Sequence, residues 1–181
     1  MTPAFAPYPW YAVVTGDELQ QGDIIEHVPI FQPKTLETEW PQPHAVFDWE
    51  ERDIVILTQS CDLVKGREKT NTVLACAVWT QSDLEAHSSQ LVTPRSLEDL
   101  RRGNLPAFHM LAACDIPDMV RDLRIVAFQT PVSLPVAFAR SMAEIDPDRL
   151  RVLPPYREHL SQAFARYFMR VGLPLDIPPF R

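Results

Sequence analysis

Short runs of aromatic and β-branched residues, separated by polar or proline-containing segments, dominate the pattern of apolar positions along this chain. Runs of this kind predict β-strands. Residues 54–57 (IVIL) are apolar at every position, which favours a strand that is buried on both faces. Residues 48–52 are polar apart from one tryptophan, and we interpret them as the tip of a hairpin. The predicted strands are 10–14, 24–31, 44–47, 53–58, 72–80, 108–114 and 123–132.

Helical signals appear mainly in the second half of the chain. Residues 82–85 resemble a capping box, and Thr93 begins a second helix that ends at Gly103. A short helix is predicted over 136–142 and a longer one over 154–171. The longer helix carries an apolar stripe at helical spacing, which indicates a face that packs on a core. The stripe consists of Tyr156, Leu160, Phe164, Phe168 and Val171.

Strands without βαβ alternation, followed by helices, predict an α+β fold. Five or six short antiparallel strands close most naturally into a small, strongly bent β-barrel. A length of 181 residues fits a single domain. We therefore expect a barrel over about residues 8–132 and a helical C-terminal extension over about 134–181, with its last helix packed on the barrel.

The composition is typical of a globular protein, and it also bears on the expected cellular location. Apolar residues make up 46% and charged residues 23%, and 18 prolines against 5 glycines predict short elements joined by stiff turns. No apolar run reaches the ~20 residues of a membrane span, and the N-terminus lacks the features of a signal peptide. The cysteines at 61, 76 and 114 form no disulfide framework. We therefore expect a cytoplasmic protein without a membrane partner.

Charge is distributed unevenly along the chain. The net charge of −7 disfavours broad binding to phosphate backbones. Residues 149–181 are different, because they hold six arginines against two acids. A solvated helix face explains this excess of arginine, and a local basic site remains open.

A polar quintet follows the buried strand and forms the first candidate binding site, because sites often lie where strands end. Its members are Thr58, Gln59, Ser60, Cys61 and Asp62. Cys61 could act as a nucleophile only beside a group that lowers its pKa, and the neighbouring carboxylate of Asp62 raises a thiol pKa. The alternative is a strand-terminal turn that Asp62 caps, with Cys61 half-buried.

Metal and cofactor motifs are missing from the sequence. Cys61, Cys76, His109 and Cys114 include no close pair of the kind that zinc sites use. No G-x-G motif or G-x-S-x-G motif occurs. We expect no metal ion and no cofactor.

Three segments resemble, in order and spacing, strands of the MazF/PemK-type toxins. Residues 21–25 (QGDII) resemble the opening strand of that family, in which a basic residue and Gly-Asp precede an apolar strand. Residues 52–57 (RDIVIL) resemble its next element, an Arg-Pro before an apolar strand. Residues 71–80 (NTVLACAVWT) resemble its third, a strand that ends in Thr or Ser. The similarity covers about residues 20–81.

The resemblance implies an SH3-like barrel and an endoribonuclease in which the RNA 2′-hydroxyl attacks the adjacent phosphate. Arg52 would stabilise the charge of the phosphorane, and Thr80 would position a phosphate oxygen. Gln21 replaces the basic residue of the family and Asp53 replaces its proline. The leading hypothesis is therefore a toxin-like or defence-associated bacterial protein that contacts RNA, with Arg52 and Thr80 as its catalytic groups.

The last helix carries a second resemblance. Residues 155–160 (PYREHL) and 170–174 (RVGLP) are similar to the C-termini of uncharacterised bacterial proteins, which implies no activity. Glu158 near the helix start and Arg166 near its end also suit the helix dipole, so the segment has a structural explanation.

The alternative function is a non-catalytic protein–protein interaction module. Trp40 and Trp49 lie in the acidic stretch between Glu37 and Asp53, and exposed tryptophans often anchor protein interfaces. The expected partner is thus RNA or a protein, such as an antitoxin-like protein, and a homodimer is left open. Thiol chemistry at Cys61 is a third hypothesis.

Overall fold

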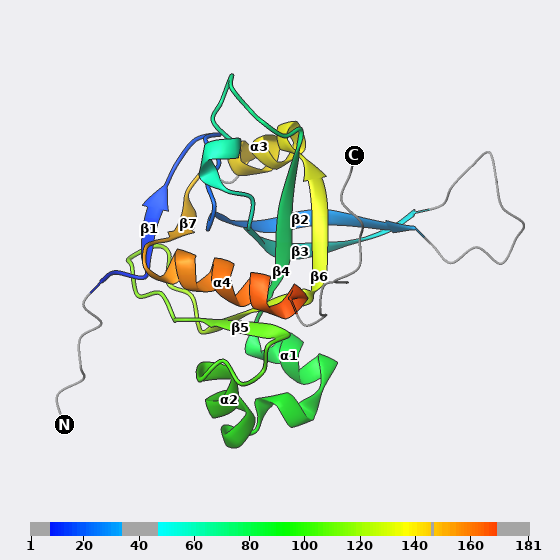
Figure 1. Cartoon of the computed structure of the whole chain (residues 1–181), viewed down its shortest axis with the longest axis vertical. Helices are drawn as coiled ribbons and strands as arrows, with labels where there is room; N and C mark the ends of the chain where they lie inside the picture. The colour runs from blue at the N-terminus through cyan, green and yellow to red at the C-terminus, as the bar shows by residue number, and fades with distance from the viewer. Residues whose placement is uncertain (1–7, 34–46, 146, 170–181) are drawn as a thin grey trace, which may run out of the picture.

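The computed structural model of this protein describes residues 8–33, 47–145 and 147–169. Figure 1 shows the strands crossing the centre of the molecule, with helices placed around them. In chain order the elements are β1 (Tyr11–Val14), β2 (Ile24–Pro33), β3 (Phe47–Ile56), the single turn η1 (Ser60–Asp62), β4 (Thr72–Trp79), α1 (Gln81–His87), the turn η2 (Ser89–Val92), α2 (Pro94–Arg101), β5 (Phe108–Leu111), β6 (Arg124–Pro135), α3 (Val136–Ile145), β7 (Arg149–Val152) and α4 (Tyr156–Phe168).

The strands form two antiparallel sheets. Five of them lie in the order β2-β3-β4-β6-β5, and β1 pairs with β7 in a separate two-stranded sheet. Helices packed beside antiparallel sheets confirm the predicted α+β class. Over the described residues neither sheet closes on itself, because β2 and β5 remain the two edges of the larger sheet. The α+β part of the fold prediction is therefore confirmed, whereas a closed barrel is not shown.

Both faces of the sheet are buried where β3 pairs with β4, which explains the apolar run at the end of β3. Val55 and Leu57 belong to a core cluster with Leu160 of α4. Ile54 and Ile56 point to the opposite face and belong to a cluster with α3. A third cluster joins α1 and α2 to β5 and to the ends of β4 and β6. Because successive side chains of a strand alternate between faces, apolar residues are needed at every position.

Two irregularities bend the large sheet. The β2–β3 register shifts between Ile25 and Val28. In the β4–β6 ladder, Cys76 pairs with Pro131, whereas the next residue of β4 pairs with Ala127. Extra residues of this kind increase local twist and bend a strand. As a result β6 turns after its pairing with β5, and its second half runs on toward α3 (Figure 1).

An ion-paired cluster holds the small sheet against the turn before β2. The carboxylate of Asp23 is fully buried and accepts hydrogen bonds from Arg149 Nε at 3.1 Å and Arg151 Nη2 at 2.9 Å. The backbone N–H of Gln20 donates to it at 3.0 Å. The N–H of Val152 then donates to the Gly22 carbonyl at 2.9 Å, so β7 is fixed beside the start of β2.

Two predicted features of the strands are wrong. Residues 48–52 are not a hairpin tip but the middle of β3, which is one continuous strand from Phe47 to Ile56. Their charged side chains are compatible with a strand because this part of the β2–β3 ladder extends beyond the rest of the sheet (Figure 1). In addition, β7 was not predicted, since two of its four residues are arginines.

The predicted helices are present with modest shifts at their ends. On α4, Leu160 is buried and Tyr156 and Phe164 pack on the core as predicted, but Phe168 is 53% exposed and Tyr167 packs instead. The predicted stripe residue Val171 lies outside the described residues. In the part of the chain that the structure describes, we find no helix with both the length and the apolar character of a membrane span.

Candidate functional site

Arg52 lies near one end of the β3–β4 ladder, and its guanidinium group is paired with a neighbouring glutamate. Its Nη2 donates to Glu50 Oε2 at 2.8 Å, and this hydrogen bond raises the pKa of Arg52. Arg52, Glu50, Trp79 and Thr130 help to line a hollow of about 60 Å³. This volume corresponds to roughly two water molecules of bulk liquid, and Thr80 is not among the lining residues.

Thr80 has a structural task at the start of α1. Its Oγ1 accepts a hydrogen bond from the N–H of Asp83 at 3.1 Å, and the Asp83 carboxylate accepts from the N–H of Thr80 at 2.8 Å. This reciprocal pair is a capping box, which satisfies backbone N–H groups at the helix start. The capping box is two residues earlier than the sequence pattern suggested. Thr80 is exposed, but its hydroxyl is directed to Asp83 at 2.8 Å.

The polar quintet after β3 forms the turn η1 and its flanks. The hydroxyl of Thr58 accepts from the N–H of Leu74 at 2.6 Å, and that of Ser60 accepts from the N–H of Gln21 at 3.1 Å. These contacts hold backbone groups in place, and Ser60 and Cys61 also line a hollow of about 350 Å³ together with Lys65. The turn interpretation of this segment therefore has direct support.

Cys61 is exposed, not half-buried as the turn interpretation expected. Its Sγ lies 3.7 Å from Gln59 Oε1 and 3.5 Å from Asp62 Oδ1. Lys69 pairs with Asp62 at 3.1 Å, and their hydrogen bond lowers the pKa of Asp62. No histidine is among the hydrogen-bond partners of Cys61 in the described residues.

Gly22 and Asp23, which carry part of the toxin resemblance, are both explained by packing. Gly22 has a φ of +90°, and a Cβ there would lie 2.9 Å from the carbonyl oxygen of Val152. Asp23 is the buried partner of Arg149 and Arg151. Neither residue is available to an RNA strand.

An exposed aromatic face lies on the extended part of the β2–β3 ladder. Phe31 and Trp49 are direct cross-strand partners, and they are 60% and 61% exposed. Phe47 is 54% exposed and has the same strand parity as Trp49, so it lies on the same face. We call Phe31, Phe47 and Trp49 the aromatic face. Trp40, the other tryptophan of the predicted interaction surface, lies outside the described residues.

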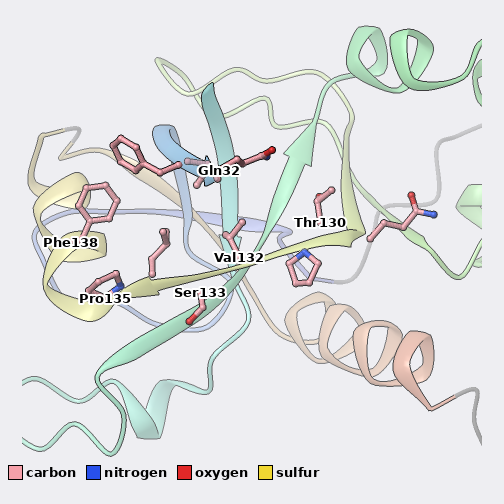
Figure 2. A pocket seen from close by; sticks show the side chains of 11 residues that line it. Gln32, Thr130, Val132, Ser133, Pro135 and Phe138 are labelled. Carbon is pink, nitrogen blue, oxygen red and sulfur yellow. The ribbon is translucent and has the colours of Figure 1, made fainter. Parts of the chain in front are cut away.

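Phe31 also borders an apolar groove of about 600 Å³. Figure 2 shows Phe138 and Pro135 near one end of this groove, Val132 at its centre and Thr130 toward the other end. The lining comes from β2, from the second half of β6 and from α3, and it contains no charged residue. Of the aromatic face, Phe31 lines the groove, whereas Phe47 and Trp49 are not among its lining residues.

Prolines limit how a partner can bind in this groove. Pro131 and Pro135 lie on β6 and line the groove, and neither has a backbone N–H. An added strand along this part of β6 would lose those hydrogen bonds. Recognition in the groove therefore depends on side chains rather than on extension of the sheet.

Acidic residues lie on both faces of β3, next to the aromatic residues in the sequence. Glu51 has the same strand parity as Phe47 and Trp49, and it pairs with His27 at 3.5 Å. Asp48 and Glu50 lie on the opposite face of β3, where Glu50 contacts Gln32 at 3.3 Å. The described part of β3 thus carries more negative than positive charge.

The described residues contain no gathering of three or more His, Cys, Asp or Glu side chains able to hold a metal ion. Cys76 lies within β4, and its burial raises the thiol pKa to about 12. Burial in the core explains Cys76 and Cys114 without a ligand role.

No model of a known protein family matches this chain, and no curated protein matches it significantly. The resemblance to MazF/PemK-type toxins therefore stays a prediction. The function has to be argued from the geometry described above.

Sequence reasoning missed Phe31 and Phe47 as surface residues. A signal was present, because Phe47 and Trp49 alternate with acids in the two-residue period of a strand. Because residues 48–52 were interpreted as a turn, this alternation was not recognised as that of a strand. The groove could not be found from sequence, since its lining combines β2 with β6 and α3.

Proposed function

We propose that this protein is a non-catalytic interaction module that binds a basic polypeptide segment carrying an apolar anchor. The observation that carries the proposal is the cross-strand pair of Phe31 and Trp49, about three-fifths exposed beside an apolar groove. Large aromatic side chains are costly to leave in water and are enriched at the centres of protein interfaces.

The groove supports the apolar anchor. Its volume of about 600 Å³ lies within the range of ligand-binding clefts, and its lining is predominantly apolar. Val132, Leu134 and Phe138 offer contact to one or two aliphatic or aromatic side chains of a partner. Polar side chains such as Gln32 and Ser133 lie among them and can fix the orientation of the partner.

The charge around the aromatic face supports the basic character of the partner. Asp48, Glu50 and Glu51 alternate with or follow the aromatic residues of β3, where they outnumber the single cation Arg52 of this strand. The whole chain carries a net charge of −7. Complementary charge speeds association and selects against acidic competitors.

The ribonuclease hypothesis stays a prediction that the local geometry favours less. Arg52 is paired with Glu50, Thr80 caps α1, and Thr80 does not line the small hollow beside Arg52. The strongly bent sheet supports a relation to SH3-like barrels, since β2 and the second half of β6 face one another across the groove. We propose such an opened barrel as the fold, without the cleavage chemistry, because one fold can host unrelated functions.

A peptide selection tests this proposal. A random peptide library displayed on phage would be selected against the full chain, and enriched peptides would be measured by calorimetry. We expect enriched sequences to combine an aromatic or aliphatic anchor with Lys or Arg. Trp49→Ala should weaken binding of the best peptide at least about tenfold, as the loss of a central aromatic anchor does.

Val120→Ala is the matched control, because Val120 is 64% exposed and lies in the connection before β6, outside the groove. It should leave peptide affinity unchanged. Urea unfolding of each variant would verify that both fold. The proposal is wrong if enriched peptides are acidic, if no consensus emerges, or if Trp49→Ala and Val120→Ala bind equally well.

A further inference from the structure

A second cavity lies at the opposite edge of the large sheet, between α2, β5 and α4. Its volume is about 270 Å³. β5 is the other edge strand, so this cavity is separate from the groove beside β2. All of its charged or ionisable lining residues are basic. They are Arg101, Arg102, His109, His159 and Arg166.

The local sequence explains why basic groups converge there. α2 ends at Arg101, and Gly103 with a φ of +74° allows the chain to reverse toward β5. Cations near a helix C-terminus are favoured by its dipole. On α4, the lining residues His159, Gln162, Ala163 and Arg166 have the three- and four-residue spacing of one helix face.

Only one carboxylate compensates these arginines directly. Glu98 accepts from Arg101 Nε and Nη2, both at 2.7 Å, and from Arg102 Nε at 2.6 Å. Within the described residues, the Nη groups of Arg102 and the whole guanidinium of Arg166 have no hydrogen-bond partner. The cavity thus keeps a positive surplus and free donors in a protein that is acidic as a whole.

His109 is the most buried titratable group of the cavity lining. Burial, and then the charge of His159, lower the pKa of His109 from 6.5 to about 4. The other charged groups around the cavity are Arg101 and Arg102 from α2 and Arg166 from α4. His109 stacks on Phe128 of β6, with ring centroids 6.2 Å apart. A bound anion would relieve the repulsion among these groups.

Apart from Gln162 and Gly103, the remaining lining is apolar. Leu100, Pro106, Phe108, Met110 and Ala163 contribute to it. An inorganic anion would leave this surface in water, whereas an ester with a small organic group would cover it. The combination of guanidinium donors and an apolar wall therefore discriminates between anions.

We propose that the cavity between α2, β5 and α4 binds a small phosphate monoester. Its phosphate group accepts hydrogen bonds from Arg102 and Arg166, and its organic group packs on the apolar wall that includes Phe108 and Met110. Guanidinium groups bind phosphate oxygens with fixed geometry and retain their charge at neutral pH. The volume of about 270 Å³ fits a ligand of this size and excludes a nucleic-acid strand.

Calorimetry with the full chain and phenyl phosphate tests the proposal. The wild-type protein should bind it, and Arg166→Gln should weaken binding roughly tenfold or more, since a charge-assisted hydrogen bond is lost. Arg95→Gln is the matched control, because Arg95 is an exposed arginine at the other end of α2, outside the cavity. NMR titration should show the pKa of His109 rising when phenyl phosphate is bound.

Comparison ligands separate the contribution of the phosphate group to the affinity from that of the organic group. Inorganic phosphate and sulfate at equal ionic strength should bind at least tenfold more weakly than phenyl phosphate, because neither covers the apolar wall. Phenol should not bind measurably. The proposal is overturned if phenyl phosphate does not bind, if phenol or inorganic phosphate binds as tightly, or if Arg95→Gln weakens binding as much as Arg166→Gln. None of these results depends on the peptide-binding proposal.

Discussion

Arg149 Nε donates a hydrogen bond at 3.1 Å to the carboxylate of Asp23, 126 residues earlier in the chain. Both side chains are buried, with 2% and 0% of their surfaces exposed. A second guanidinium, that of Arg151, reaches the same carboxylate at 2.9 Å. The cluster joins β7 to the turn before β2, and the Asp23 carboxylate is the counter-charge that both guanidinium groups share.

Asp23→Asn is expected to lower the free energy of unfolding by about 3–5 kcal/mol, because it leaves buried guanidinium groups without a counter-charge. Urea unfolding at pH 7 measures this loss. Asp122→Asn serves as the control, since Asp122 is exposed and should change stability by less than about 0.5 kcal/mol. A loss for Asp23→Asn as small as that of the control would show that the cluster does not stabilise the fold.

Two glycines with similar backbone angles should respond differently to alanine. Gly22 has a φ of +90°, and its Cβ would lie 2.9 Å from the carbonyl oxygen of Val152, whereas Gly16 has a φ of +78° and open space. Both changes cost roughly 1–2 kcal/mol for the left-handed conformation. Gly22→Ala should cost at least about 1 kcal/mol more, because backbone must move. Thermal unfolding of the two variants gives the comparison, and equal losses would contradict it.

The stability of the protein should depend on pH through His109. Its pKa is about 4 in the folded state and about 6.5 in the unfolded chain, so between these values the unfolded state binds more protons. The stability associated with a neutral His109 in the folded state is fully present above pH 6.5, and it is lost as the pH falls to 4. At about 1.4 kcal/mol for each pKa unit, the wild type should lose roughly 2–3 kcal/mol from this residue.

His109→Gln removes this titration and should flatten the stability profile between pH 7 and 4. The exposed His87 offers a control, His87→Gln, which should keep the slope of the wild type. Urea unfolding in phosphate-free buffers measures all three proteins. If His109→Gln and the wild type lose stability in parallel, the pKa of His109 is not depressed in the folded state.

Incubation of the purified protein with RNA distinguishes the two leading functional hypotheses. Because Arg52 is paired with Glu50 and Thr80 caps α1, we expect no cleavage that depends on either residue. Thr80→Ala should instead lower stability by about 1 kcal/mol through loss of the cap. RNA cleavage by the wild type that Arg52→Ala abolishes would favour the ribonuclease hypothesis over the interaction module.

Local sequence patterns predicted the strands whose environment is uniformly apolar. Residues 54–57 could be assigned because both faces of β3 are buried there. β7 could not, because the pairing of Arg149 and Arg151 with Asp23 is a long-range compensation that no local pattern reveals. Residues 48–52 were interpreted as a turn because most of them are charged. Charged residues are nevertheless compatible with a strand here, because an extended two-stranded ladder exposes both of its faces.

The candidate site was only partly predictable. Trp49 was expected at an interaction surface because of its residue type and acidic neighbours. Its partnership with Phe31 required the β2–β3 register, which includes a bulge after Ile25. The cavity beside α2 combines arginines and histidines from two helices and a strand, so only the packing of those elements brings them together.

The pairing of β1 with β7 has a consequence for biosynthesis. Tyr11 lies opposite Val152, so β1 leaves the ribosome long before β7, its pairing partner, has been synthesised. During translation the apolar side chains of β1 have no sheet to join. A prematurely terminated chain that lacks β7 would therefore present β1 as an unpaired strand to chaperones and proteases.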